Sequence, residues 1–261
     1  MPSASRLSYT LAGEMAGRVV RVLIDCSSPH ALASLATEAQ VRSSVASRVL
    51  ASLQSLDVIA RKPRGMIEGV HWQDLLRRWC SEAPPCTRRQ QYGFAPLRTV
   101  EEFALRLSQS GLLHALTADA ALSRLTGKPM PTVIALYVDD VAAAASQFQL
   151  HPASDNATVV LLKPSDRSVF HRSVEAAGLR YVSPSLMAAD LCGSKSFDSA
   201  IAWMAEHEAD WRHPHPLPRL AKAAAAHKED ASRAIGQRPS RGMAKREVTT
   251  AAKAAPTKSH A

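Results

Sequence analysis

The sequence predicts a mixed protein of α+β or α/β class that begins with a winged helix-turn-helix and ends in a disordered basic tail. Three observations support this prediction. Two short helical patterns separated by about three residues precede a segment of hairpin type. Strand and helix patterns then alternate from residue 99 onward, as they do in an α/β domain. Beyond residue 211 the chain has too few large apolar side chains to form a core.

These observations divide the chain of 261 residues, which is long enough for two domains with separate cores. A winged helix-turn-helix DNA-binding domain is predicted over 11–80, a linker over 81–98, an α/β domain over 99–211 and the tail over 212–261. The segment "SEAPPCTRRQQYGFAPL" is assigned to the linker because it fits neither a helix nor a strand pattern.

Helical periodicity marks three segments at the start of the chain. In "LAGEMAGRVVRVLIDC" the apolar residues at helical spacing are Leu11, Met15, Val19, Val22 and Leu23. A short helix is predicted from Leu32 to Ala39, and a longer one from Ser43 to about Leu56. The segment "DVIARKPRGMIEGV" predicts two strands around the turn "KPRG". The segment "HWQDLLRRWC" predicts an amphipathic helix with Trp72, Leu75, Leu76 and Trp79 on one face.

The second and third helices carry the strongest functional signal in the sequence. The positions expected to be buried are Leu32, Leu35, Ala36, Val41, Val49, Leu53 and Leu56. The remaining face carries Arg42, Ser43, Ser44, Ser47 and Arg48, whose short hydroxyls and guanidinium groups suit contacts with phosphates and base edges. Gln40 stands where glycine usually eases the turn, so it is expected to adopt an awkward backbone angle.

The hairpin that follows carries Arg61, Lys62 and Arg64, which are expected to neutralise flanking phosphates. A helical domain with a merely solvated polar face is the alternative. The charge distribution favours DNA, because residues 17–80 hold nine Lys and Arg against five Asp and Glu. Residues 81–211 hold eleven against fourteen, and residues 212–261 hold eleven against three. Double-stranded DNA is therefore the predicted partner.

The second domain is expected to begin with Thr99 and Glu102, which form the capping box of a helix that runs to about Ser108. Strand and helix patterns follow in "GLLHALT", "DAALSRL", "TVIALYV", "DDVAAAASQFQL", "ATVVLLK", "LRYVS" and "PSLMAADLC", and "FDSAIAWMAEHEADW" predicts the last helix. This alternation predicts a sheet with helices packed on it.

Several classes of protein are not supported. No apolar run approaches the length of a membrane span, and the N-terminal residues lack a secretory pattern, so a cytoplasmic, nucleoid-associated protein is expected. Cys26, Cys80, Cys86 and Cys192 form no C-x-x-C pair and are expected to be reduced and mostly buried. His213 and His215 lack a neighbouring carboxylate cluster, so no metal site and no cofactor are predicted.

The segments "SLATEAQVRSSVASRVLASLQSLDVI" and "GVHWQDLLRRW" resemble the winged-helix end of actinobacterial regulators of the AbiEi-type antitoxin family. The likeness continues through "LYVDDVAAAASQFQL", "VVLLKPSD" and "GLRYVSPSLMAADLCGS", and it covers roughly residues 15–205. It implies a transcriptional repressor that doubles as the antitoxin of a type IV toxin–antitoxin system. It also implies a cognate toxin of nucleotidyltransferase type and a second domain with a nucleotidyltransferase-like fold.

That fold raises an alternative function, a nucleotide-binding or nucleotidyltransferase enzyme with an accessory DNA-binding domain. Nucleotidyl transfer needs a Gly-Ser turn that grips phosphate and carboxylates that hold Mg²⁺. This chain has Ala118 and Asp119 at the expected turn, and its paired carboxylates, Asp139 and Asp140, are adjacent. We expect this pair to end a strand and cap the next helix, and Asp190 to lie at the surface or in a cap. No catalytic residue is therefore predicted.

Overall fold

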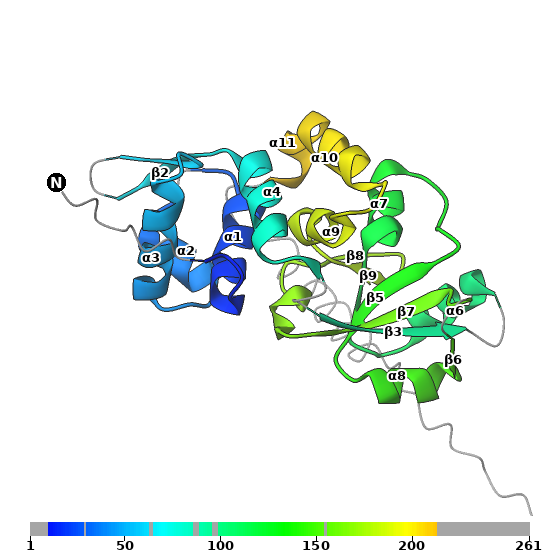
Figure 1. Ribbon diagram of the computed structural model, residues 1–261. Coiled ribbons are helices and arrows are strands. Elements are labelled where there is room, and N and C mark those ends of the chain that lie inside the picture. Colours follow the sequence, from blue (N-terminus) through cyan, green and yellow to red (C-terminus); the bar gives the residue numbers. More distant parts are fainter. Residues whose placement is uncertain are drawn as a thin grey trace, which may run out of the picture. The chain divides into compact units, whose positions relative to one another are not determined.

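The computed structural model describes residues 10–28, 30–62, 65–85, 89–95, 99–153 and 156–212, and it has a mixed α and β fold (Figure 1). The helices are α1 (Glu14–Asp25), α2 (Leu32–Glu38), α3 (Ser43–Gln54), α4 (Trp72–Glu82), α6 (Val100–Gln109), α7 (Ala118–Thr126), α8 (Val141–Phe148), α9 (Pro184–Leu191), α10 (Phe197–Glu206) and α11 (Glu208–Trp211), with a 3₁₀ helix η1 (Arg167–Phe170). The strands are β1 (Ile59–Arg61), β2 (Ile67–Val70), β3 (Arg89–Ala95), β4 (His114–Thr117), β5 (Ile134–Val138), β6 (His151–Pro152), β7 (Val159–Pro164), β8 (Val174–Ala176) and β9 (Leu179–Tyr181). Arg64 and the predicted tail from residue 213 onward lie outside the described residues.

The N-terminal part has the element order that the sequence predicts. Three helices, α1 to α3, precede the antiparallel pair β1 and β2, and α4 follows. His30 joins the hairpin through two backbone hydrogen bonds of 2.9 Å with Ile67, so a third extended segment borders β2. The predicted apolar face of α4 is confirmed, because Trp72, Leu75, Leu76 and Trp79 are all buried.

The buried face of α3 differs in part from the prediction. Ala46, Val49, Leu50 and Leu53 are buried, as the helical period requires. Leu56 is wrongly predicted to be buried and is 36% exposed, because α3 ends at Gln54 and the helical period no longer places Leu56. Leu32 and Val41 are partly buried against the core.

The first helix also departs from its predicted face at one end. Met15 is 45% exposed, because Ala16 and Gly17 of the same turn face the buried side. From Val19 onward α1 is buried on nearly every side, Arg21 and Asp25 included. This helix therefore lies inside the protein and contacts α2, α3, α4 and α9.

The second half of the chain forms a seven-stranded mixed sheet in the order β6-β3-β7-β5-β4-β9-β8. The pairs β5–β7 and β4–β9 are parallel, and the other four neighbouring pairs within the described residues are antiparallel. Strand β5 has a neighbouring strand on each side, β7 and β4. Four of its residues are buried: Ile134, Leu136, Tyr137 and Val138. The alternation of strands and helices is confirmed, although three strands were not predicted.

The prediction that residues 81–98 form a linker is wrong for residues 89–95. These residues form β3, which pairs with β7 over six residue pairs from Arg89 to Phe94. The sequence "RQQYGFA" lacks the alternation of a half-buried strand because Gln90, Gln91 and Tyr92 are all exposed. Backbone hydrogen bonds to β7 hold this strand in the sheet. Its side chains therefore need no alternation of apolar and polar residues, and the sequence does not predict a strand here. The strands β6 and β8 were missed because they span two and three residues.

Helix α9 connects the two halves of the fold. Every residue of α9 from Ser185 to Leu191 is buried, and the helix contacts α1 and α4 as well as α7, α10 and β4. Phe103 of α6 and Phe148 of α8 meet edge to face at 5.2 Å. The predicted capping of α6 is confirmed by the hydrogen bond from the Glu102 N–H to Thr99 Oγ1.

The end of the described chain returns to the first helix. Trp211 packs edge to face on Trp72 at 5.3 Å. Arg212 was assigned to the tail, and that boundary is wrong. Its guanidinium donates to the carbonyls of Leu23, Ile24 and Cys26 at 2.8 to 3.3 Å and so caps the C-terminus of α1. Within the described residues no helix has the length and apolar character of a bilayer span.

Candidate nucleic-acid interface

The turn between α2 and α3 fixes the angle at which α3 leaves the core. Gln40 adopts φ 52°, so the expected awkward backbone angle is confirmed. The Val41 N–H then donates to the Ala36 carbonyl at 3.0 Å, which closes the turn against a small buried side chain. Arg18 of α1 donates to the Gln40 carbonyl at 3.4 Å. The turn is therefore held from both α2 and α1.

One face of α3 is turned toward solvent. The five predicted residues share the outward face of α3 and its N-cap. Four of them are exposed, namely Arg42, Ser43, Ser44 and Arg48, and Ser47 is half-buried. Arg42 is the N-cap residue, and its side chain does not cap the helix. The Arg48 Nε donates to the Ser44 carbonyl at 3.3 Å, which lays this guanidinium along the helix surface.

Among the described hairpin residues, both predicted cations, Arg61 and Lys62, have polar partners. Lys62 is exposed but forms an ion pair with Glu68 of β2. Arg61 is half-buried, and its Nη1 lies 3.5 Å from Gln54 Oε1 at the end of α3. This contact ties the hairpin to the solvent-exposed face of α3. The register between the strands shifts next to Arg61, which the sequence did not indicate.

The first helix carries polar contacts that sequence reasoning missed. Arg18 forms a bidentate ion pair with Asp166, and Arg21 donates to the Ser168 and His171 carbonyls at 2.9 and 3.3 Å. Asp25 accepts from the Ser185 N–H at 3.1 Å. The spacing of Arg18, Arg21 and Asp25 places them on one helix face, and this polar stripe on an apolar helix is the signal that could have indicated them.

These contacts change the acid–base behaviour of the side chains involved. Burial by itself would raise the pKa of Asp166, but hydrogen bonds from Arg18 and Ser168 outweigh burial and hold it below its ordinary value. The hydrogen bond to Asp166 raises the pKa of Arg18. Arg21 is buried without a carboxylate at ion-pair distance among the described residues, and burial lowers its pKa. The face of α1 that meets η1 therefore carries two arginines in different settings. Arg18 is paired with Asp166, whereas Arg21 is buried without such a carboxylate among the described residues.

The adjacent carboxylates of the second half lie where the sequence predicts. Strand β5 ends at Val138, and Asp140 accepts from the Ala143 N–H at 3.0 Å to cap α8. Asp139 pairs instead with Arg167 of η1 at 3.0 Å. Ala118 begins α7 with φ 50°, a backbone angle that favours glycine. Asp139 and Asp140 therefore each have a structural partner of their own, Arg167 and the Ala143 N–H.

The prediction for Asp190 is wrong, because this residue lies neither at the surface nor in a cap. Its carboxylate is fully buried and pairs with Arg89 Nη1 at 2.6 Å. It also accepts from Thr117 Oγ1 at 2.7 Å and from the Tyr137 hydroxyl at 2.8 Å. A buried charge needs such partners, and they come from β3, β4 and β5. Sequence patterns could not bring these strands together.

No group of three or more His, Cys, Asp and Glu able to hold a metal ion occurs in the part of the chain that the structure describes. Comparisons with protein-family models, with curated proteins and with solved structures gave no match.

Proposed function

We propose that this chain is a sequence-specific DNA-binding transcriptional regulator, in which α1 to α3 and the β1–β2 hairpin form a winged helix-turn-helix. The observation that carries the proposal is the outward face of α3. It combines two exposed arginines with three serines, and it follows a tight turn that is held by Ala36 and Arg18. A helix presented in this way fits the major groove of DNA.

The chemistry of the α3 face suits both backbone and base contacts. Its N-terminus has neither a side-chain cap nor an acidic residue in the first turn, so its N–H groups suit a phosphate. Ser43 and Ser44 are short hydroxyl residues that allow close approach, and Arg48 reaches farther along the helix. In this assignment Arg42 and Arg48 are the main candidates for guanine edges.

The hairpin takes the role of a wing that contacts the flanking backbone. Lys62 is an exposed cation among the described hairpin residues, and DNA phosphates compete with Glu68 for it. Arg61 connects the hairpin to Gln54 of α3, so it positions the wing. The resemblance to AbiEi-type regulators implies repression of the promoter that carries the bound site. The resemblance of residues 15–205 to AbiEi-type antitoxins extends the proposal to an antitoxin whose cognate toxin is of nucleotidyltransferase type.

A direct test measures the affinity of the full chain for DNA from upstream of its own gene and for a shuffled duplex of equal composition. Arg42→Ala and Arg48→Ala should each weaken binding to the upstream DNA by roughly 5- to 150-fold, the loss expected for one bidentate base contact. Affinity for the shuffled duplex should change much less, because base contacts carry the preference.

Arg124→Ala is the matched control, since Arg124 is an exposed arginine on α7. It should leave both affinities unchanged. Thermal unfolding of all three variants checks that the fold survives. Upstream DNA bound no better than the shuffled duplex, or α3 variants that bind like Arg124→Ala, would contradict the assignment.

A further inference from the structure

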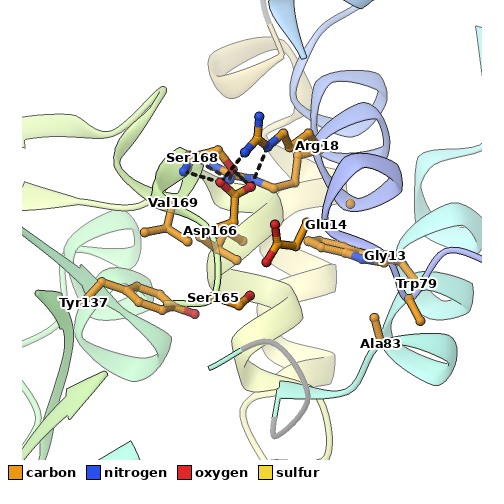
Figure 2. Close-up of a pocket in the computed structure, with 14 residues that line it drawn as sticks. Gly13, Glu14, Arg18, Trp79, Ala83, Tyr137, Ser165, Asp166, Ser168 and Val169 are labelled. Carbon is orange, nitrogen blue, oxygen red and sulfur yellow. Dashed lines mark hydrogen bonds and ion pairs between the residues drawn. The ribbon is translucent and has the colours of Figure 1, made fainter. Parts of the chain in front are cut away.

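A cavity of about 130 Å³ lies where α1 meets α4, α9 and the segment around η1 (Figure 2). Arg18 and Arg21 of α1 line it, together with Asp166 and Ser168. In Figure 2 the rings of Trp79 and Tyr137 lie on opposite sides of the labelled site. The cavity therefore combines polar groups with aromatic walls, as small-molecule sites do.

Arg21 places a buried guanidinium at the cavity wall, and no carboxylate among the described residues lies at ion-pair distance from it. Only 6% of this residue is exposed, and its Nη1 and Nη2 donate to uncharged carbonyls and a serine hydroxyl. Its Nε is buried and has no hydrogen-bond partner among the described residues. The two carboxylates that act electrostatically on Arg21 have partners of their own, since Asp166 pairs with Arg18 and Asp25 with Arg172. A buried guanidinium with a free donor favours an anionic ligand.

The size and the other charges of the cavity limit that ligand. A cavity of about 150 Å³ holds a benzene molecule, whereas sites for drug-sized ligands start near 300 Å³. Glu14 and Asp166 also line the cavity and disfavour ligands with several negative charges. Trp79, Val169 and Leu186 supply apolar wall. These features together fit a ligand with one negative charge and a compact apolar body.

The same wall is connected to the α2–α3 turn. Arg18 forms two hydrogen bonds with Asp166 and a third with the Gln40 carbonyl, so a single side chain borders the cavity and holds the turn. A ligand that competes for Arg18 or displaces Asp166 changes the support of α3. A coupling of this kind needs only a ligand that binds one arrangement better than the other.

We propose that this cavity binds a small organic monoanion with a compact apolar body and that the bound anion regulates the affinity of α3 for DNA. The regulatory part rests on the proposed function, whereas the binding part does not. Benzoate is the probe for the site, with benzamide as its neutral isostere, benzylamine as the cationic match and ATP as a large polyanion.

Calorimetric titration of the full chain tests the binding part without DNA. Benzoate should bind at least 10-fold more tightly than benzamide, benzylamine or ATP. Arg21→Gln should weaken benzoate by at least 10-fold, whereas Arg124→Gln, which changes an exposed arginine outside the cavity lining, should not. Ser165→Phe adds bulk at an exposed lining position and should abolish binding without relying on a buried change. Equal affinities for benzoate and benzamide, or no binding of benzoate at millimolar concentration, would overturn the site.

The regulatory part is tested by DNA titrations with and without saturating benzoate. The affinity for upstream DNA should change at least 3-fold in the unmodified chain and stay constant in Ser165→Phe. Benzoate that binds in calorimetry but leaves the DNA affinity unchanged overturns the regulation and keeps the site. A chain that binds no DNA overturns the regulation together with the proposed function, while calorimetry still decides the site.

Discussion

Arg18 and Asp166 are 148 positions apart and form a two-pronged ion pair, with Nε 2.6 Å from Oδ2 and Nη2 2.7 Å from Oδ1. Asp166 also accepts from the Ser168 N–H and hydroxyl, so its carboxylate is held from two sides. Arg18 reaches onward to the Gln40 carbonyl. The α2–α3 turn and the loop after β7 therefore share one guanidinium group.

The first prediction concerns the strength of this pair. A double-mutant cycle with Arg18→Gln and Asp166→Asn should give a coupling free energy of about 1.5–3 kcal/mol in urea unfolding, the range for charged hydrogen bonds. The exposed Asp74–Arg77 pair on α4 is the control and should give at most about 0.5 kcal/mol. Equal coupling for the two pairs would contradict a special role for Arg18 and Asp166.

The second prediction concerns His114, which is buried at the start of β4. Its Nε2 accepts from the Arg180 N–H at 3.1 Å, so Nδ1 carries the proton and donates to the Leu112 carbonyl at 2.9 Å. Burial lowers the pKa of His114 below 6.5. Stability from the neutral ring is thus fully present above the unfolded pKa and is lost as the pH falls below about 6.5.

Urea unfolding between pH 7.5 and 5.5 measures this effect. The unmodified chain should lose stability more steeply than His114→Gln, which cannot titrate in this window. At pH 7.5 the variant should be less stable by about 1–3 kcal/mol, because it loses hydrogen bonds in a buried place. His151→Gln, at an exposed position, should follow the unmodified chain. Parallel curves for His114→Gln and the unmodified chain would refute the assignment.

The third prediction concerns the buried contacts of Asp190. Asp190→Asn keeps the shape of the side chain but leaves Arg89, whose side chain is 10% exposed, without its anionic partner. We expect a loss of about 3–5 kcal/mol in the free energy of unfolding. Asp198→Asn removes an exposed carboxylate from α10 and should change stability by less than about 0.5 kcal/mol. A small effect at both positions would show that the ion pair with Arg89 contributes little.

The helices and their buried faces followed from the sequence where periodicity was regular. The paired apolar positions of α4 and the capping of α6 by Thr99 depend on neighbours within one turn, so local patterns identify them. The strand β3 depends on hydrogen bonds to β7, about seventy residues later, and its exposed glutamines hide it. Asp190 and Arg89 could not be paired in advance for a similar reason, because Asp190 lies on α9 and Arg89 on β3, and only the packing of α9 on the sheet brings them together.

The candidate interface was predictable to a different degree at each position. The exposed face of α3 and the backbone angle of Gln40 follow from helical spacing and from the known strain of such turns. The ion pair of Lys62 with Glu68 and the shift in register at Arg61 depend on how two strands align, which the turn sequence did not specify. The role of Arg18 needed the loop that holds Asp166, which lies far along the chain.

The fourth prediction addresses the alternative enzymatic function. Incubation with labelled nucleotides, Mg²⁺ and either protein or RNA acceptors should give no incorporation above a protein-free blank. Asp139 is paired with Arg167 and Asp140 caps α8, so neither carboxylate is poised for a shared metal ion. Magnesium-dependent labelling that disappears in Asp139→Ala, but persists in Asp198→Asn, would place the enzymatic function first.

The fifth prediction concerns residues 213–261, which lie outside the described residues and carry ten Lys and Arg against three Asp and Glu. A chain truncated after Arg212 retains the guanidinium that caps α1 and lacks only the charges of residues 213–261. It should bind upstream and shuffled duplexes more weakly by similar factors. The slope of log affinity against log salt should become shallower, because each lost phosphate contact removes about 0.9 from the slope.

Sequence preference should survive this truncation, because it belongs to Arg42, Ser43, Ser44, Ser47 and Arg48 on the α3 side of the molecule. A chain that ends at Trp211 is the structural comparison. It loses three hydrogen bonds to the end of α1 and should be less stable than the chain that ends at Arg212 by about 1–3 kcal/mol. DNA titrations of the full chain and of the chain that ends at Arg212, each at two salt concentrations, then measure the contribution of residues 213–261. Identical salt slopes for the full chain and the chain ending at Arg212 would mean that residues 213–261 do not contact DNA.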